Sequence, residues 1–398
     1  PSPCINGKAP ARVCDACGDD MNVRRNLSRQ RRWHLPCIFR SKALCSRLTI
    51  ALALLVIAHR LRVGADLAAL DAPVRNGAVA ATQTQQLDCN DDFVGNKVVL
   101  DAIQVAKPTT ASNDLRIACF IMTHSGNHDT RVRSVLSTWG KRCDHLLVAS
   151  NVTDDAIGAV AIDAKATWKN LWKKLQKTLQ HLWETYHDDD DVQWFLKADD
   201  DSYIIMENLK SFLAQQTRTA TMTSQPLIYG RHFGIPMSKM KSDIGDANYI
   251  RRMQQRFQWD PASTIFRFPS GGSSYVFNKP YLKLLIDGIR NPSTFDVVPK
   301  AKPPEDLSQA LVAYEQSNGT VEVSTTRDPA ERFHMFSPRD MYTLEKWQDA
   351  RTWVHRFAPD GIVAGRGCCS PHSISFHQID RVEGLMQYMD RQLYECRK

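Results

Sequence analysis

The stretch that decides the fold is Trp194-Phe195-Leu196-Lys197-Ala198-Asp199-Asp200-Asp201-Ser202-Tyr203. Its apolar first half is typical of a buried strand, and three consecutive carboxylates follow directly. Like charges this close raise the free energy of ionising one another. A divalent cation removes that cost, and carboxylate oxygens are ligands that suit Mg²⁺ and Mn²⁺. We therefore expect an Asp-x-Asp metal site that holds the diphosphate of a nucleotide-sugar. A solvated acidic turn is the alternative.

Strand and helix patterns alternate around this stretch. Short apolar runs predict strands over Arg116–Thr123, Asp144–Ala149 and 193–198. Helices are predicted over Arg131–Trp139, Trp168–Tyr186 and Glu207–Leu213, the second of them from apolar residues at helical spacing. This alternation indicates an α/β sheet. Ligands of such sheets bind beyond the carboxyl ends of the strands, which is where the Asp triplet is expected to lie.

The net charge divides the chain into two parts. Overall the 398 residues carry a formal charge of +8, which on its own suggests a nucleic-acid partner. Residues 1–62, however, contain 12 Lys and Arg against 3 Asp and Glu, and the remainder contains 39 against 40. The remainder is therefore nearly neutral, and we expect no nucleic-acid partner for it. The chain is 43% hydrophobic and 24% charged, which is typical of a globular protein.

The basic excess flanks an apolar segment. Residues 43–58 are apolar apart from Ser46, Arg47 and Thr49, which is short for a spanning helix. Positive charge before the segment favours a cytoplasmic N-terminus. We expect a cytoplasmic basic tail over 1–42, a transmembrane signal-anchor over 43–62, a stem over 63–112 and a single catalytic domain over 113–398. The alternatives to the anchor are a cleaved signal peptide and a buried helix of a soluble protein.

The cysteines fall into two groups. In the basic tail, the spacing of four residues resembles a zinc half-site: Cys14, Cys17, His34 and Cys37. The alternative is that this spacing is a coincidence in a Cys-rich leader. The six that follow the anchor are Cys89, Cys119, Cys143, Cys368, Cys369 and Cys396. An even number in an oxidising compartment permits three disulfides. Cys119 with Cys143 is the natural pairing between neighbouring strands. The vicinal Cys368 and Cys369 are expected in two separate disulfides.

Three further motifs offer groups for catalysis. Ser270-Gly271-Gly272 precedes a strand-like run, where glycine permits close backbone approach to a substrate or simply makes a turn. Glu305 and Asp306 begin a predicted helix, where a carboxylate serves either as a general base or as a helix cap. His334 lies between aromatic residues and is either a packed structural histidine or a third metal ligand. His377 is the alternative ligand.

Taken in order along the chain, these motifs resemble the core 1 β1,3-galactosyltransferase family, which belongs to glycosyltransferase family 31 and is related to the Fringe enzymes. The resemblance runs from about residue 115 to 380. It is carried by Cys119–Thr123, Ser137–Trp139, Phe195–Tyr203, Tyr229–Arg231, Ser270–Gly272, Glu305–Leu307, Arg332–His334 and Gly367–Ser370. No single motif is specific, but the ordered set is.

The resemblance implies a Rossmann-like GT-A fold and an inverting, Mn²⁺-dependent reaction. Galactose would pass from UDP-galactose to the 3-hydroxyl of GalNAc on Ser or Thr of a glycoprotein. The protein would be a type II membrane protein of the Golgi with a lumenal catalytic domain. The residues implied are the metal ligands Asp199, Asp201 and His334, the UDP contacts Thr123, Arg133, Lys173 and Asp200, and the catalytic base Asp306.

Two features leave alternatives open. Residues 235–266 form a longer connection than the family has there, either a surface loop, which we favour, or a segment that reshapes the acceptor cleft. A related β1,3-transferase with another donor or acceptor is therefore an alternative. A non-catalytic chaperone of the same fold is another, although the Asp triplet argues against it. A zinc-dependent adaptor would rest on the tail alone. The oligomeric state, including a homodimer, stays open.

Overall fold

The computed structural model describes residues 88–397, with gaps at 165–166, 168–169, 217–223, 292–303, 322–330, 344–352 and 359–360. The predictions for the basic tail, the zinc half-site, the signal-anchor and the first half of the stem, residues 63–87, lie outside the described residues. Within the described part of the chain, no helix is both long and apolar enough to span a bilayer.

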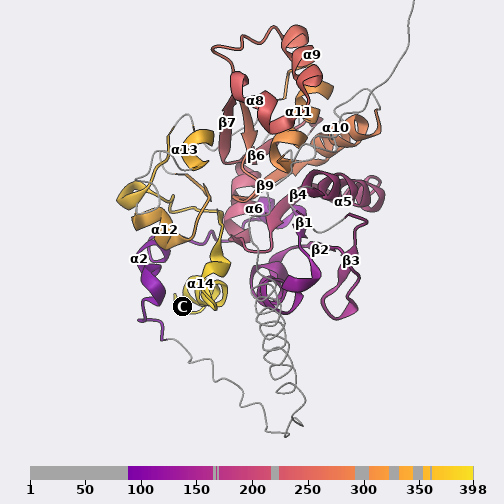
Figure 1. Ribbon diagram of the computed structural model, residues 1–398. Coiled ribbons are helices and arrows are strands. Elements are labelled where there is room, and N and C mark those ends of the chain that lie inside the picture. Colours follow the sequence, from indigo (N-terminus) through magenta and orange to yellow (C-terminus); the bar gives the residue numbers. More distant parts are fainter. Residues whose placement is uncertain are drawn as a thin grey trace, which may run out of the picture. The chain divides into compact units, whose positions relative to one another are not determined.

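A six-stranded mixed sheet forms the centre of the molecule (Figure 1). Its strands in spatial order are β3 (Ala159–Ala161), β2 (His145–Ser150), β1 (Arg116–Met122), β4 (Val192–Asp199), β9 (Tyr275–Asn278) and β6 (Ile228–Gly230). The first four strands are parallel, and β9 is antiparallel to both of its neighbours. The α/β sheet is therefore confirmed, and the three predicted strands are present within one or two residues of their expected bounds.

Three helices pack against one another beside this sheet: α5 (Leu171–Tyr186), α10 (Lys279–Arg290) and α11 (Glu305–Gln316) (Figure 1). The apolar stripe of α5 is core packing, since Trp172, Leu175, Leu179 and Leu182 are all buried. The helix begins at Leu171, three residues later than predicted. Because α10 also contacts β4 and β9, this layer fixes the start of α11 near the central strands.

The helix predicted over Arg131–Trp139 is broken into three turns. A π-turn, η3 (His128–Val132), leads into α4 (Arg133–Ser137), and a 3₁₀ turn, η4 (Trp139–Arg142), follows. The last turn buries Trp139 completely, and its indole Nε1 donates to the carbonyl of Ser202 at 2.8 Å. This bond ties the turn that follows the Asp triplet to the protein core. Helix α6 (Met206–Gln216) follows that turn, as predicted.

A second, three-stranded sheet joins the C-terminal part of the chain to the Asp triplet. Its order is β10 (Phe333–His334), β11 (Ser375–Phe376) and β5 (Tyr203–Ile204). Strand β11 runs antiparallel to β5, so the residues after β11 lie beside those before β5. The backbone N–H of Ile379 donates to the carbonyl of Asp201 at 3.0 Å, which fixes this arrangement. Helices α12 (Pro338–Thr343), α13 (Trp353–Phe357) and α14 (Leu385–Tyr394) complete the described C-terminal part.

The favoured expectation of a surface loop over 235–266 is wrong. The segment contains two helices, α8 (Met237–Ile244) and α9 (Ala247–Phe257), between the antiparallel strands β7 (His232–Pro236) and β8 (Ile265–Pro269). Helix α9 buries Tyr249, Ile250 and Met253, and the ring of Trp259 lies 5.4 Å from that of Tyr314 on α11. This segment therefore packs along the helix that begins with Glu305.

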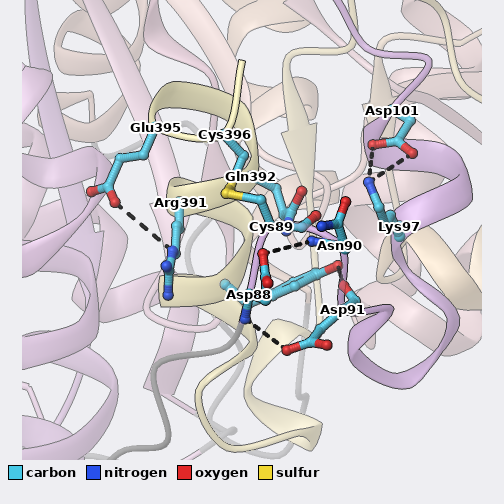
Figure 2. Close-up of a disulfide and its surroundings, with 11 residues drawn as sticks. Asp88, Cys89, Asn90, Asp91, Lys97, Asp101, Arg391, Gln392, Glu395 and Cys396 are labelled. Carbon is cyan, nitrogen blue, oxygen red and sulfur yellow. Dashed lines mark hydrogen bonds and ion pairs between the residues drawn. A yellow bond between two sulfur atoms is a disulfide. The ribbon is translucent and has the colours of Figure 1, made fainter. Parts of the chain in front are cut away.

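The folded body begins before residue 113. Helix α2 (Lys97–Leu100) contacts α12 and α14, and Val99, Leu100 and Ile103 are buried in the core. A disulfide joins Cys89 to Cys396 near the two ends of the described chain (Figure 2). The residues from 88 to 112 that the sequence assigns to the stem thus belong to the folded body. Helix α3 (Thr110–Asn113) lies directly before β1.

Three disulfides lie within the described residues. The predicted pair Cys119–Cys143 is confirmed. The expectation that Cys368 and Cys369 pair with separate partners is wrong, because the two residues are bonded to each other. Six cysteines follow residue 88. Cys89 is bonded to Cys396 and Cys119 to Cys143, so Cys368 and Cys369 have no other cysteine among the six with which to pair.

We predict that the double variant Cys89→Ser/Cys396→Ser unfolds more easily than the natural chain. The bond links residues 307 positions apart, and it constrains the unfolded chain strongly. Urea denaturation should show a loss of about 2–5 kcal/mol in the free energy of unfolding. The comparison variant is Cys119→Ser/Cys143→Ser. Its cysteines lie only 24 positions apart, so the loss of free energy of unfolding from the shorter loop should be smaller. An unchanged midpoint in the first variant would contradict the described connection.

Candidate active site

A cleft of about 680 Å³ opens where β1 and β4 end. These two parallel strands pair so that Met122 lies opposite Asp199, and both strands end at the same edge of the sheet. The cleft volume is within the range of about 300–1,000 Å³ that is usual for small-molecule sites. In the sheet, β2 and β3 lie on the far side of β1 from β4, so the chain order reverses between β1 and β4, and the cleft lies at the ends of these two strands. This is the point where α/β sheets commonly bind ligands.

Two carboxylates of the triplet and one imidazole form a candidate metal site. The ligand atoms of Asp199, Asp201 and His377 all lie within 4.8 Å of one another. His377 Nε2 is 3.2 Å from Asp201 Oδ1 and 3.7 Å from Asp199 Oδ2. Burial raises the pKa of Asp201, but the hydrogen bond and charge of His377 and the charge of Arg131 outweigh it, and the pKa is about 2. The Asp201 carboxylate is thus ionised, as a cation ligand must be.

The structure brings His377 rather than His334 to the carboxylates. His377 follows β11, and the antiparallel pairing of Phe376 with Tyr203 places it beside Asp201. His334 lies on β10, one strand further away, and its ring stacks on Phe376 at 4.5 Å. Its Nε2 bonds to Ser373 Oγ at 2.8 Å, and burial lowers its pKa to about 3. His334 thus fits a buried structural histidine, and His377 takes the place that the resemblance gave to His334.

Asp200 lies between the two candidate ligands in the sequence and forms hydrogen bonds with residues of the cleft wall. It is buried, and its Oδ2 accepts from Thr123 Oγ1 at 2.6 Å and from Asn127 Nδ2 at 2.8 Å. Its Oδ1 accepts from Arg131 at 3.0 Å. Both oxygens are therefore engaged by protein donors. Asp200 orients Thr123 and Arg131, which both line the cleft, as does Asp200 itself.

The two cations predicted to contact the nucleotide point elsewhere. Arg133 is exposed and pairs with Asp129 at 3.2 Å, and Lys173 is exposed on α5. Neither of them lines the cleft, whereas their near neighbours Arg131 and Lys174 do. Lys174 is buried, its Nζ donates to the carbonyl of Thr123, and burial lowers its pKa to about 8.

A signal for Lys174 was present in the sequence. It lies three residues after Leu171 and four before Thr178, so it belongs to the inward face of α5. Lys173 is one position out of this phase. For Arg131 no comparable signal exists, because the π-turn at His128–Val132 breaks the helical phase.

Asp306 lies at the start of α11 with its carboxylate turned toward the Gly271 backbone. Its Oδ2 accepts from the N–H of Gly271 at 2.9 Å, and its Oδ1 accepts from that of Leu307 at 2.7 Å. Burial, followed by the charge of Glu305, raises the pKa of Asp306 to about 7. A carboxylate with this pKa can exchange a proton near neutral pH, as a general base must.

The two glycines after Ser270 permit close packing in the cleft. A Cβ added to Gly271 would lie 2.3 Å from Glu305 Oε1, and one added to Gly272 would lie 2.3 Å from His377 Cε1. Both distances are shorter than any real Cβ contact. Glycine is therefore required at both positions for Glu305 and His377 to keep their places.

Sequence reasoning also missed Lys197, which lies inside β4 and is fully buried. Its Nζ is 2.6 Å from Asp199 Oδ1 and 3.1 Å from Glu305 Oε1. Burial lowers the pKa of Lys197, but the charges of Asp199 and Glu305 more than offset this and raise it. The available signal was a lysine inside an otherwise apolar strand, which requires a buried partner.

Of three comparisons with known proteins, the match to a family model is the one that shows the family. A Fringe-like family model matches residues 110–377. The glycoprotein-N-acetylgalactosamine 3-beta-galactosyltransferase 1 of Xenopus laevis is 27% identical over 270 residues, which are 67% of this chain and 64% of the relative. A solved 4-diphosphocytidyl-2C-methyl-D-erythritol synthase from Anaerococcus prevotii is 12% identical, covering 55% of this chain and 89% of the other, with a TM-score of 0.28. A score this low supports no inference about the fold.

If the Asp199–Asp201–His377 group holds a divalent cation, Gly272→Ala should weaken its binding, because the added methyl group displaces the ring of His377. The expected loss is about 10- to 100-fold in affinity, measured by titration of the protein with Mn²⁺ under electron paramagnetic resonance. Gly367→Ala is the matched control, since the nearest atom to its Cβ is Val363 Cγ1 at 3.8 Å. Equal affinities for both variants would argue against His377 as a ligand.

Proposed function

Because the chain belongs to the Fringe-like family, we propose that it is an inverting β1,3-galactosyltransferase of GT-A fold. It transfers galactose from UDP-galactose to the 3-hydroxyl of GalNAc linked to Ser or Thr of a glycoprotein. The observation that carries this proposal is the presence, in one cleft, of the Asp199–Asp201–His377 group and the buried Asp306. The similarity to the Xenopus glycoprotein-N-acetylgalactosamine 3-beta-galactosyltransferase supports the choice of galactose and of the acceptor.

Asp199, Asp201 and His377 fit a Mn²⁺ ion. Their three ligand atoms are close enough to share one cation. Carboxylates suit both Mg²⁺ and Mn²⁺, while the imidazole favours a transition metal. Bound there, Mn²⁺ would stabilise the negative charge of a departing diphosphate. Arg131 and Lys174, which line the same cleft, add positive charge from the protein itself.

Asp306 acts on the acceptor. In an inverting transfer the acceptor hydroxyl attacks the anomeric carbon from the side opposite to the nucleotide, and one base must take its proton. The Asp306 carboxylate is held by the Gly271 N–H and is one of the groups that line the cleft. Its raised pKa, about 7, makes it a stronger base than an ordinary aspartate.

A related β1,3-transferase with another donor or acceptor is the second candidate. It is favoured by the segment 235–266, because Phe233 on β7, just before it, lines the cleft and packs on Phe268 and Phe357. In this second candidate, Phe233 would contact an acceptor sugar other than GalNAc. A non-catalytic chaperone is not favoured, since such a protein would need neither a paired carboxylate site nor a buried base.

The proposed location is the Golgi membrane, with a type II anchor and a lumenal catalytic domain. Three disulfides within the described residues support an oxidising compartment. Partners in this proposal are the membrane and the GalNAc-bearing glycoproteins that serve as acceptors.

The test is a transfer assay on the full chain with Mn²⁺, crossing a panel of UDP-sugars with GalNAc-peptide, GlcNAc and fucose acceptors. Turnover is expected for UDP-galactose with GalNAc-peptide. Asp306→Asn should lower kcat by about 10²- to 10⁴-fold, the usual contribution of a general base, while leaving the affinity for UDP unchanged. Asp287→Asn, an exposed position on α10, is the matched control.

Two results would contradict the proposal. Absence of turnover of UDP-galactose on GalNAc-peptide would reject the acceptor and donor, and turnover with another pair would favour the second candidate. Full activity of Asp306→Asn would reject Asp306 as the base.

A further inference from the structure

Lys197 has one acceptor for each of its three ammonium protons. Its Nζ lies 2.6 Å from Asp199 Oδ1, 3.1 Å from Glu305 Oε1 and 3.1 Å from the carbonyl oxygen of Gly271. An ammonium has three donors and no acceptor, so this set satisfies it completely. The three acceptors come from three separate segments: the end of β4, the start of α11 and the glycine turn.

The acceptors of Lys197 connect the metal site with the base. Because Lys197 engages Asp199 Oδ1, the other oxygen, Oδ2, is the one that faces His377 at 3.7 Å. The Gly271 peptide accepts from Lys197 at its carbonyl and donates through its N–H to Asp306 Oδ2 at 2.9 Å. Asp199 and Asp306 are therefore linked through one ammonium and one peptide group.

Stability alone does not explain a lysine here. Its neighbours in β4, Leu196 and Ala198, are buried and apolar, and a methionine at 197 would extend this apolar strand. A buried ion pair often stabilises a protein no more than well-packed apolar residues of similar volume do. The charge at this position therefore calls for a role other than packing.

We propose that Lys197 is a positioning residue that sets the geometry of the metal-binding Asp199 and holds the proton-accepting Asp306 in its reactive state. This inference rests on the proposed function. Lys197 is fully buried and is not one of the residues that line the cleft. It acts through Asp199 on one side and through Gly271 and Glu305 on the other.

The charges around Asp306 define the direction of the effect. Titratable groups that face it are Glu305 on its own helix, Lys197 on β4 and Tyr275 on β9. Burial and then Glu305 raise the pKa of Asp306, whereas Lys197 lowers it. Removing the positive charge should therefore raise the pKa of Asp306 further, and removing the Glu305 charge should lower it.

The experiment compares pH profiles of kcat/KM for the full chain. In the natural protein, activity requires ionised Asp306, so kcat/KM should fall as the pH drops below about 7. Lys197→Met should move this acid limb upward by roughly one pH unit and reduce Mn²⁺ affinity by roughly 10- to 100-fold. Lys197→Arg keeps the charge and should leave the limb in place. Glu305→Gln should move it downward, and this variant tests the inference even if Lys197→Met does not fold.

Lys210→Met is the matched control. Lys210 on α6 pairs with Asp144 at 2.9 Å, outside the cleft, and its removal should change neither the acid limb nor Mn²⁺ affinity. A purely structural role for Lys197 predicts a loss of stability in Lys197→Met with an unmoved acid limb and unchanged Mn²⁺ affinity. That result would overturn the inference.

A readout without turnover separates this inference from the proposed function. Carbon-13 NMR of the Asp306 carboxyl, assigned with Asp306→Asn, gives its titration without any donor or acceptor. If the natural chain transfers no sugar, the proposed function fails, but the Asp306 titration in Lys197→Met still supports or rejects the coupling. An Asp306 titration that is the same in the natural chain, Lys197→Met and Glu305→Gln rejects it.

Discussion

Five carboxylates meet at the edge of the sheet where β4 ends, namely those of Asp199, Asp200, Asp201, Glu305 and Asp306. Ionised carboxylates this close repel one another, and burial strengthens the repulsion. Three buried or half-buried basic side chains partner four of them: Lys197 lies against Asp199 and Glu305, Arg131 against Asp200, and the imidazole of His377 against Asp201. Among the described residues Asp306 has no ion-pair partner, and it is the one whose pKa rises to about 7. The proposed division between ligands and base follows from this distribution of basic groups, together with the burial of Asp306 and the neighbouring charge of Glu305.

Backbone geometry holds these charges at close range. The glycine turn lets Glu305 and His377 approach within a distance that a Cβ would prevent. The small sheet of β5, β11 and β10 brings His377 to the Asp triplet from the far end of the chain. The indole of Trp139 fixes the Ser202 carbonyl just after the triplet. The glycine turn, the small sheet and Trp139 belong to different segments of the chain. The short motifs of the site are therefore spread over the sequence.

The sequence was sufficient to predict the strands and the sheet edge that form the site, but not to decide which of several nearby side chains enter it. Apolar runs that end in Thr123 and Asp199 predict strands and the edge at which ligands bind. The sequence could not decide between His334 and His377 as the metal ligand. His334 lies in the two-residue strand β10 and His377 follows the two-residue strand β11, and only the pairing of β11 with β5 determines which of them faces Asp201. Arg131 was missed because a π-turn shifts the helical phase, and the vicinal pairing of Cys368 could not follow from spacing alone.

We propose that His377 completes a cation site with Asp199 and Asp201. Pulsed electron paramagnetic resonance of the Mn²⁺-loaded full chain tests it most directly, because an imidazole ligand gives nitrogen modulation. We expect this modulation in the natural protein and in His334→Gln, and we expect its loss in His377→Gln. Loss in His334→Gln with retention in His377→Gln would contradict it.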